Sequence, residues 1–310
     1  SPTFAFMRTG SKSMLAAILA ATLSSCGGGG SDEAEAVSTA VPVEVSAPDT
    51  TMAPTSEAPT SAPTTVAAPE VLRILVTNDD GYDAEGIDAL VEGLLMLPDV
   101  EVTVVAPLAN QSGTGGNTTE GDLLSSAVSL ASGYPATAVD GFPADSIVWA
   151  LERNGVDEMP HLVVSGINEG QNIALEIAGF SGTVGAARAA ALRGVPSLAV
   201  SHGVGESIDY SPGVELALEW ITEHRDELLA QEGREPLESF TSINVPTCAD
   251  GTSVRGIVEV VIESIAVGDY GIQDCASTVP ESSITGDVSG FNNGFAVETV
   301  LAVAGAPFTD

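Results

Sequence analysis

Two kinds of apolar pattern alternate along residues 71–301. Short runs of consecutive apolar residues predict buried strands, and segments with apolar residues three or four apart predict helices. The predicted strands cover residues 71–76, 100–107, 161–164, 196–200 and 240–245. The predicted helices cover residues 87–95, 144–151, 183–192 and 213–229. Residues 256–262 and 295–301 have the pattern of further β-strands.

This alternation predicts an α/β fold with a doubly wound, mostly parallel sheet and a C-terminal β extension. In such sheets, ligands bind beyond the carboxyl ends of the strands. We therefore expect the chemistry of the protein in the loops that follow the strands.

The N-terminal segment has the pattern of an export signal. Arg8 and Lys12 precede an apolar run from Met14 to Leu23, which is too short for a membrane span. The run ends in Leu-Ser-Ser-Cys26 and a glycine stretch, which resembles a bacterial lipobox with Cys26 as the lipidated residue. An ordinary cleaved signal with a chance cysteine is the alternative. The lipobox predicts an exported protein anchored by lipid at the cell envelope.

Three regions are expected. Residues 1–26 are the predicted lipoprotein signal, residues 27–70 a linker, and residues 71–310 the catalytic domain. The linker is rich in Ala, Pro, Thr and Ser without an apolar period, so it cannot form a core.

The formal net charge of the 310-residue chain is −34, and all acidic residues follow Cys26. Such a surface repels nucleic-acid polymers and anionic lipids, so membrane association is expected only through the lipid anchor. Small phosphate esters remain possible partners, because a bound cation can reverse the local charge.

The chain has three cysteines and no C-x-x-C pair, which gives little support to a zinc or thioredoxin-like site. If Cys26 is lipidated, Cys248 and Cys275 remain in an exported protein, and we expect them to form a disulfide bond. Two buried free thiols are the alternative.

The loop after the first strand contains adjacent carboxylates, Asp79 and Asp80. Unpaired, each would raise the pKa of the other at an energetic cost, which a divalent cation removes. A helix-capping aspartate beside a solvated one is the alternative.

The next loops offer neutral oxygens and backbone amides. Ser112 and Gly113 follow the second strand, and Asn168 follows the third. Ser181 to Thr183 opens a helix, whose N-terminal amides suit a phosphate. A simple turn, a structural asparagine and a helix N-cap are the alternatives. The all-oxygen set of two carboxylates, a hydroxyl and an amide favours Mg²⁺ or Mn²⁺.

Several motifs resemble the survival protein SurE family in order and spacing. They are Asn78-Asp-Asp-Gly81, Gln111-Ser-Gly113 after Ala106-Pro107, Ser165-Gly-Ile-Asn168, Ser181-Gly-Thr-Val184 and Ile243-Asn-Val-Pro246, with Gly141-x-Pro143-x-Asp145 as a looser match. The resemblance implies a 5'/3'-nucleotidase, a metal-dependent phosphomonoesterase, with nucleoside monophosphates as substrates and a homodimeric assembly. It implies that Asp79, Asp80, Ser112 and Asn168 bind the metal, with the two aspartates catalytic. Gly113, Asn117, Ser181, Gly182 and Thr183 would hold the phosphate.

The late part of the chain departs from the family pattern. The positions where the family has an Asp and a His fall at Ala304 and Phe308. This departure motivates the alternative of a degenerate member that binds metal or nucleotide without turnover. A phosphoacceptor or haloacid-dehalogenase-like enzyme needs a late lysine, and this chain has none after Lys12. Direct attack by water and a phospho-enzyme both remain open.

Overall fold

The computed structural model describes residues 70–153, 155–231, 235–265 and 270–305. The predicted signal with Cys26, the predicted linker up to residue 69, and Phe308 lie outside the described residues. No helix within the described ranges is long and apolar enough to cross a membrane.

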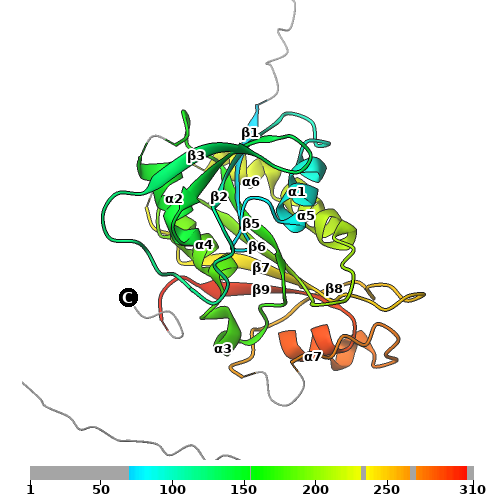
Figure 1. Cartoon of the computed structure of the whole chain (residues 1–310). Helices are drawn as coiled ribbons and strands as arrows, with labels where there is room; N and C mark the ends of the chain where they lie inside the picture. The colour runs from blue at the N-terminus through cyan, green and yellow to red at the C-terminus, as the bar shows by residue number, and fades with distance from the viewer. Residues whose placement is uncertain (1–69, 154, 232–234, 266–269, 306–310) are drawn as a thin grey trace, which may run out of the picture. The chain divides into compact units, whose positions relative to one another are not determined.

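The predicted strands and helices occur in the predicted order, together with strands at residues 124–129 and 135–140 and short helices at residues 174–178 and 287–292 that the apolar pattern did not predict (Figure 1). The strands are β1 (Leu72–Thr77), β2 (Val100–Pro107), β3 (Leu124–Ser129), β4 (Pro135–Asp140), β5 (Leu162–Glu169), β6 (Ser197–His202), β7 (Ser239–Val245), β8 (Ile257–Glu259) and β9 (Ala296–Ala302). The helices are α1 (Glu85–Leu94), α2 (Pro143–Glu152), α3 (Ala174–Ala178), α4 (Gly182–Ala191), α5 (Ser211–Glu223), α6 (Arg225–Ala230), the 3₁₀ turn η1 (Glu281–Ser283) and α7 (Asp287–Asn292).

The described strands form one mixed sheet in the order β3-β4-β2-β1-β5-β6-β7-β9-β8. The six strands from β4 to β7 in this order are parallel, and β3 and β9 run antiparallel to their neighbours β4 and β7. The chain first moves outward from β1 to β2 and β4, and then returns to place β5 beside β1. This reversal creates a topological switch point at the carboxyl ends of β1 and β5, where ligands bind in such sheets.

Helices cover both faces of the sheet, which gives three layers. Ile74 and Val76 of β1 pack with α1, α5 and α6, whereas Leu75 between them packs with α2 and α4. The alternation follows from the opposite directions of successive side chains in a strand. The α/β three-layer fold and the C-terminal β extension predicted from the sequence are confirmed.

The long helix predicted over residues 213–229 is wrong, because α5 ends and α6 begins on either side of His224. The Trp220 carbonyl accepts hydrogen bonds from both the His224 backbone amide (3.0 Å) and its Nδ1 (2.8 Å). The imidazole therefore competes for a carbonyl that a continuing helix would reserve for its backbone.

A disulfide bond joins Cys248, after β7, to Cys275, before η1, with a Cα–Cα distance of 5.6 Å. The same segment is held by Gln273, whose Oε1 accepts from the Thr247 amide (2.5 Å) and whose Nε2 donates to the Val204 carbonyl (2.8 Å). These links fix residues 270–277 over the carboxyl ends of β6 and β7.

Candidate metal and phosphate site

Asp79 follows β1 after one intervening residue, Asn78, and is buried, with 2% of its surface exposed. Thr183 Oγ1, in the first turn of α4, donates a hydrogen bond to Asp79 Oδ1 (2.5 Å). Burial raises the pKa of Asp79, and hydrogen bonds from the Thr183 side chain and from the backbone amides of residues 79, 183 and 182 act against this. The N-terminal turn of α4 therefore faces the carboxylate of Asp79 in this structure.

The close approach of α4 to Asp79 depends on Gly182. A Cβ atom at that position would lie 2.7 Å from the Asp79 Cβ and 2.9 Å from Pro143 Cγ. Real carbon atoms do not approach so closely, so any other residue would push α4 away from the carboxylate. Gly185, one turn later, is similarly required, since a Cβ there would lie 2.1 Å from the Gly115 carbonyl oxygen.

Asp80 faces β5. Its Oδ2 accepts the Glu169 backbone amide (2.8 Å), and its Oδ1 accepts Asn110 Nδ2 (3.0 Å). Burial is the largest cause that raises the pKa of Asp80 to about 6, and the nearby charges of Asp79 and Glu169 add to it. A bound cation would stabilise the ionised form of this carboxylate and offset the effect of burial.

Asn168 sits in β5 beside Glu169, and β5 pairs with β1 through Thr77 and Ser165. The side chain is 6% exposed, and its Nδ2 donates to the Gly170 carbonyl (2.5 Å). This bond fixes the amide so that its carbonyl oxygen is the atom left to bind a cation. Because Glu169 bonds Asp80, the backbone next to Asn168 lies against the acidic pair.

Ser112 is exposed, and its hydroxyl makes no contact with the aspartates among the described interactions. Asn110 nevertheless links the two, since its Oδ1 accepts the Ser112 amide (2.9 Å) while its Nδ2 donates to Asp80. The loop that carries Ser112 is thus held beside the carboxylates. Sequence reasoning gave Asn110 no role, because nothing in the sequence shows that its amide joins two loops.

The rest of this loop rests on α4. The Gly115 amide donates to the Phe180 carbonyl (2.9 Å), directly before the helix. Gly113 has positive φ (80°) and open space around it, and Asn117 is exposed, with its amide bonded to the Thr114 carbonyl (3.2 Å). No described interaction brings Gly113 or Asn117 to the aspartates, so the contact of these two residues with phosphate stays a prediction.

Ser181 is the N-cap of α4, and its Oγ accepts the Val184 amide (3.1 Å). This is the capping role that the sequence left open, and the hydroxyl keeps its proton for donation to another group. The Thr183 hydroxyl, by contrast, already donates its hydrogen bond to Asp79. Phosphate binding by Ser181, Gly182 and Thr183 stays a prediction.

Asp145 anchors the far end of the same loop. It is buried in α2 and accepts hydrogen bonds from the Thr119 amide (2.9 Å), the Thr119 hydroxyl (2.7 Å) and the Phe142 amide (2.8 Å). The sequence placed Asp145 near a helix start without a function. The structure shows that it fixes the loop between Ser112 and β3.

The donor set fits a hard divalent cation. Within the described ranges no three His, Cys, Asp or Glu residues gather as a metal site. Two carboxylates and two neutral oxygens do not form such a group and suit Mg²⁺ or Mn²⁺ better than softer metals. Asp79 and Asp80 would supply the charge, and the fixed amide of Asn168 would supply a neutral oxygen from the neighbouring strand.

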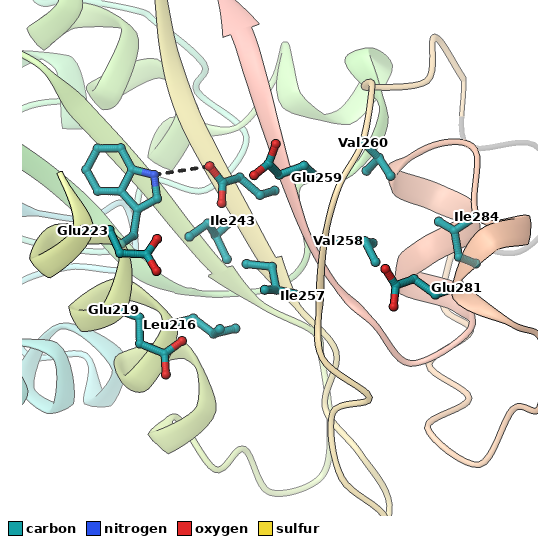
Figure 2. A pocket seen from close by; sticks show the side chains of 12 residues that line it. Leu216, Glu219, Glu223, Ile243, Ile257, Val258, Glu259, Val260, Glu281 and Ile284 are labelled. Carbon is teal, nitrogen blue, oxygen red and sulfur yellow. Dashed lines mark hydrogen bonds between the residues drawn. The ribbon is translucent and has the colours of Figure 1, made fainter.

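A separate cavity of about 350 Å³ lies between α5, β7, β8 and η1 and contains none of the candidate residues (Figure 2). It is lined by aliphatic side chains, Trp220 and several glutamates. Trp220 Nε1 donates to Glu298 Oε1 (3.3 Å), as the dashed line shows. The cavity is strongly acidic and would repel phosphate esters, so we do not place the substrate there.

Comparison with known proteins supports the motifs. The chain matches the family described as "Survival protein SurE" over residues 74–264, well over half of its length. A "5'-nucleotidase SurE" of Halobacterium salinarum is 50% identical over 128 residues, which are 41% of this chain and 46% of that protein. The "5'-nucleotidase SurE" of Brevibacillus brevis is 41% identical over 181 residues, 56% of this chain and 66% of that protein.

The fold agrees as well. The crystal structure of the SurE protein from Aquifex aeolicus matches with a TM-score of 0.58 and 26% sequence identity, over 76% of this chain and 95% of that chain. The matched segments span about half to two thirds of the two sequence relatives named above. On the family match, the ordered motifs and the fold, this chain belongs to the SurE family.

Proposed function

We propose that this protein is a metal-dependent phosphomonoesterase that hydrolyses nucleoside 5'- or 3'-monophosphates. The observation that carries the proposal is the pair Asp79 and Asp80 at the switch point of the sheet. Asp79 meets the N-terminal turn of α4, and Asp80 meets β5 beside Asn168. The relatives named "5'-nucleotidase SurE" support the same activity.

The residues of the chain would act as follows. Asp79, Asp80, Ser112 and Asn168 would hold a divalent cation, with Mg²⁺ or Mn²⁺ favoured by the oxygen donors. When bound, the cation supplies positive charge that offsets the charge on the transferred phosphoryl group. Ser181 and the amides of α4 would donate to phosphate oxygens, together with Gly113 and Asn117 of the facing loop. One of the aspartates can accept the proton of the attacking group.

A substrate-by-metal panel tests the proposal. We expect release of inorganic phosphate from nucleoside 5'- or 3'-monophosphates in the presence of Mn²⁺ or Mg²⁺, and none from DNA or RNA polymers. Calorimetric binding of a nucleotide and metal without any phosphate release would contradict catalysis, and would instead describe a degenerate member of the family.

We propose further that the protein is exported and lipid-anchored through Cys26. The lipobox-like sequence supports this, and the Cys248–Cys275 disulfide fits an oxidising compartment. Growth of expressing bacteria with a labelled fatty acid should label the wild type and leave Cys26→Ser unlabelled. Equal labelling of both proteins would contradict the anchor.

We propose that the protein forms a homodimer. Val261 and Val300 are 71% and 66% exposed at the β9 side of the sheet, where apolar surface favours association. Light scattering coupled to size exclusion should give twice the monomer mass, and a monomer at all protein concentrations would contradict this.

A further inference from the structure

Tyr210 directly precedes α5 and is 7% exposed. Its ring meets His202 edge to face, with 5.8 Å between ring centroids. On the other side it packs on α1, where a Cβ atom at Gly86 would lie 3.0 Å from Tyr210 Cε1. The ring is therefore fixed by its neighbours, and the position of its hydroxyl is determined by packing.

The hydroxyl of Tyr210 has no hydrogen-bond partner among the described residues, and its oxygen is not among their fully enclosed polar atoms. A Cβ atom at Gly86 would clash with both the Ile167 carbonyl oxygen and Tyr210 Cε1, so the ring lies beside the backbone that leads to Asn168. The carboxylates whose charges act on the hydroxyl are Glu169, Asp80 and Glu85. Burial, followed by these three carboxylates, raises the pKa of Tyr210 to about 12. Tyr210 thus offers a protonated phenol beside the part of β5 that contacts Asp80, and its hydroxyl is open to donate a hydrogen bond to another molecule.

The position of Tyr210 relative to the sheet indicates which part of a substrate it would meet. Tyr210 packs with α1 and α5 on one face, whereas α4, which meets Asp79, lies on the opposite face. The phosphate is expected at the α4 face. In phosphoryl transfer the attacking and leaving oxygens lie roughly in line, so the alcohol part extends away from the phosphate cradle.

We propose that the Tyr210 hydroxyl donates a hydrogen bond to a sugar oxygen of the bound nucleoside monophosphate, and so selects substrates with a sugar next to the ester. The inference deepens the proposed function and rests on it for the identity of the substrate. Tyr210 would bind the alcohol part and leave the phosphate and metal contacts to the residues described above.

Tyr210→Phe tests this, because it keeps the ring and removes only the hydroxyl. With Mn²⁺ present, we expect calorimetric binding of a non-hydrolysable nucleoside phosphonate to weaken about 3- to 10-fold, as for the loss of one neutral hydrogen bond. Binding of inorganic phosphate should not change. In kinetics, KM should rise for a nucleoside monophosphate and stay unchanged for p-nitrophenyl phosphate, which has no sugar.

The matched control is Tyr134→Phe, which removes a phenol hydroxyl that donates to the Val102 carbonyl (2.7 Å) near β3. This variant should change neither the binding of the phosphonate nor the KM for the nucleoside monophosphate. Unchanged phosphonate binding in Tyr210→Phe would overturn the inference, as would an equal loss for phosphonate and inorganic phosphate. If the wild type releases no phosphate from any substrate, the proposed activity fails, while the binding comparison still decides the role of Tyr210.

Discussion

Asp79 is the residue on which the proposed chemistry most depends, because it is buried and held by Thr183 at the start of α4. We expect Asp79→Asn to fold normally and to lose about 10²-fold or more in phosphate release, since a neutral amide binds a hard cation weakly. Circular dichroism and phosphate release measure the two properties. The matched control is Asp226→Asn on the exposed side of α6, which should keep full activity. Turnover by Asp79→Asn at the wild-type rate would remove Asp79 from the site.

The raised pKa of Asp80 predicts how the folding stability of the metal-free protein depends on pH. Burial, with the charges of Asp79 and Glu169, raises the pKa of Asp80 from 3.8 to about 6. The folded state then holds this proton more tightly than the unfolded chain, so the stabilising contribution is complete below pH ~4 and is lost as pH rises through about 6.

We therefore expect the melting temperature of the metal-free wild type to fall more between pH 4 and pH 7 than that of Asp80→Asn. Scanning fluorimetry in a chelator measures both proteins under the same conditions. An equal or larger fall in the variant would show that Asp80 does not carry the raised pKa.

At the residue scale, the sequence predicted the candidate cation ligands but not the residues that position them. Asp79 and Asp80 follow β1, and Asn168 lies near the carboxyl end of the neighbouring β5, so their convergence follows from the parallel topology. Asn110, Asp145 and Tyr210 act through contacts with residues far away in the chain. Such contacts leave no local periodicity or motif that could show them.

At the scale of elements, the close approach of α4 to Asp79 sets the geometry of the candidate site. A Cβ at Gly182 would lie 2.7 Å from the Asp79 Cβ. We expect Gly182→Ala to displace α4 and to reduce both Mn²⁺ affinity and phosphate release by about tenfold or more, since loss of correct geometry is costly in catalysis. Calorimetric titration with Mn²⁺ gives the affinity.

Gly116→Ala in the facing loop is the control for a glycine substitution near the site. A Cβ there would have only Arg188 Nη1 nearby, at 3.8 Å, so metal binding and activity should not change. If Gly182→Ala binds Mn²⁺ as tightly as Gly116→Ala, the close contact between α4 and Asp79 has no role in the metal site.

Elements with a clear apolar pattern were predicted almost to their ends, such as β2 and β7. The strand β3 was missed because it lies at the edge of the sheet with nearly every side chain exposed, so its sequence does not alternate. Among the described strands, β3 pairs with β4 alone. The short helices α3 and α7 were missed for a similar reason, since five or six residues are too few to show a helical period.

At the scale of the whole molecule, the Cys248–Cys275 disulfide secures the C-terminal part on the sheet. It closes a loop with a sequence separation of 27 residues. We expect the double variant Cys248→Ser/Cys275→Ser to lose about 3 kcal/mol in the free energy of unfolding, since the cross-link restricts the unfolded chain. Urea denaturation measures it. Reduction should destabilise the wild type and leave the double variant unaffected, and equal stability of the two proteins under oxidising conditions would contradict the bridge.

The proposed hydrolysis of phosphate esters requires an oxygen-ligated divalent cation at Asp79 and Asp80. The most direct measurement is phosphate release from a nucleoside monophosphate by the chelator-stripped protein as Mn²⁺ is added back. We expect no release without metal and activity that saturates with Mn²⁺ in the wild type, and no recovery in Asp79→Asn. Undiminished release from the stripped protein, or equal recovery in Asp79→Asn, would contradict it.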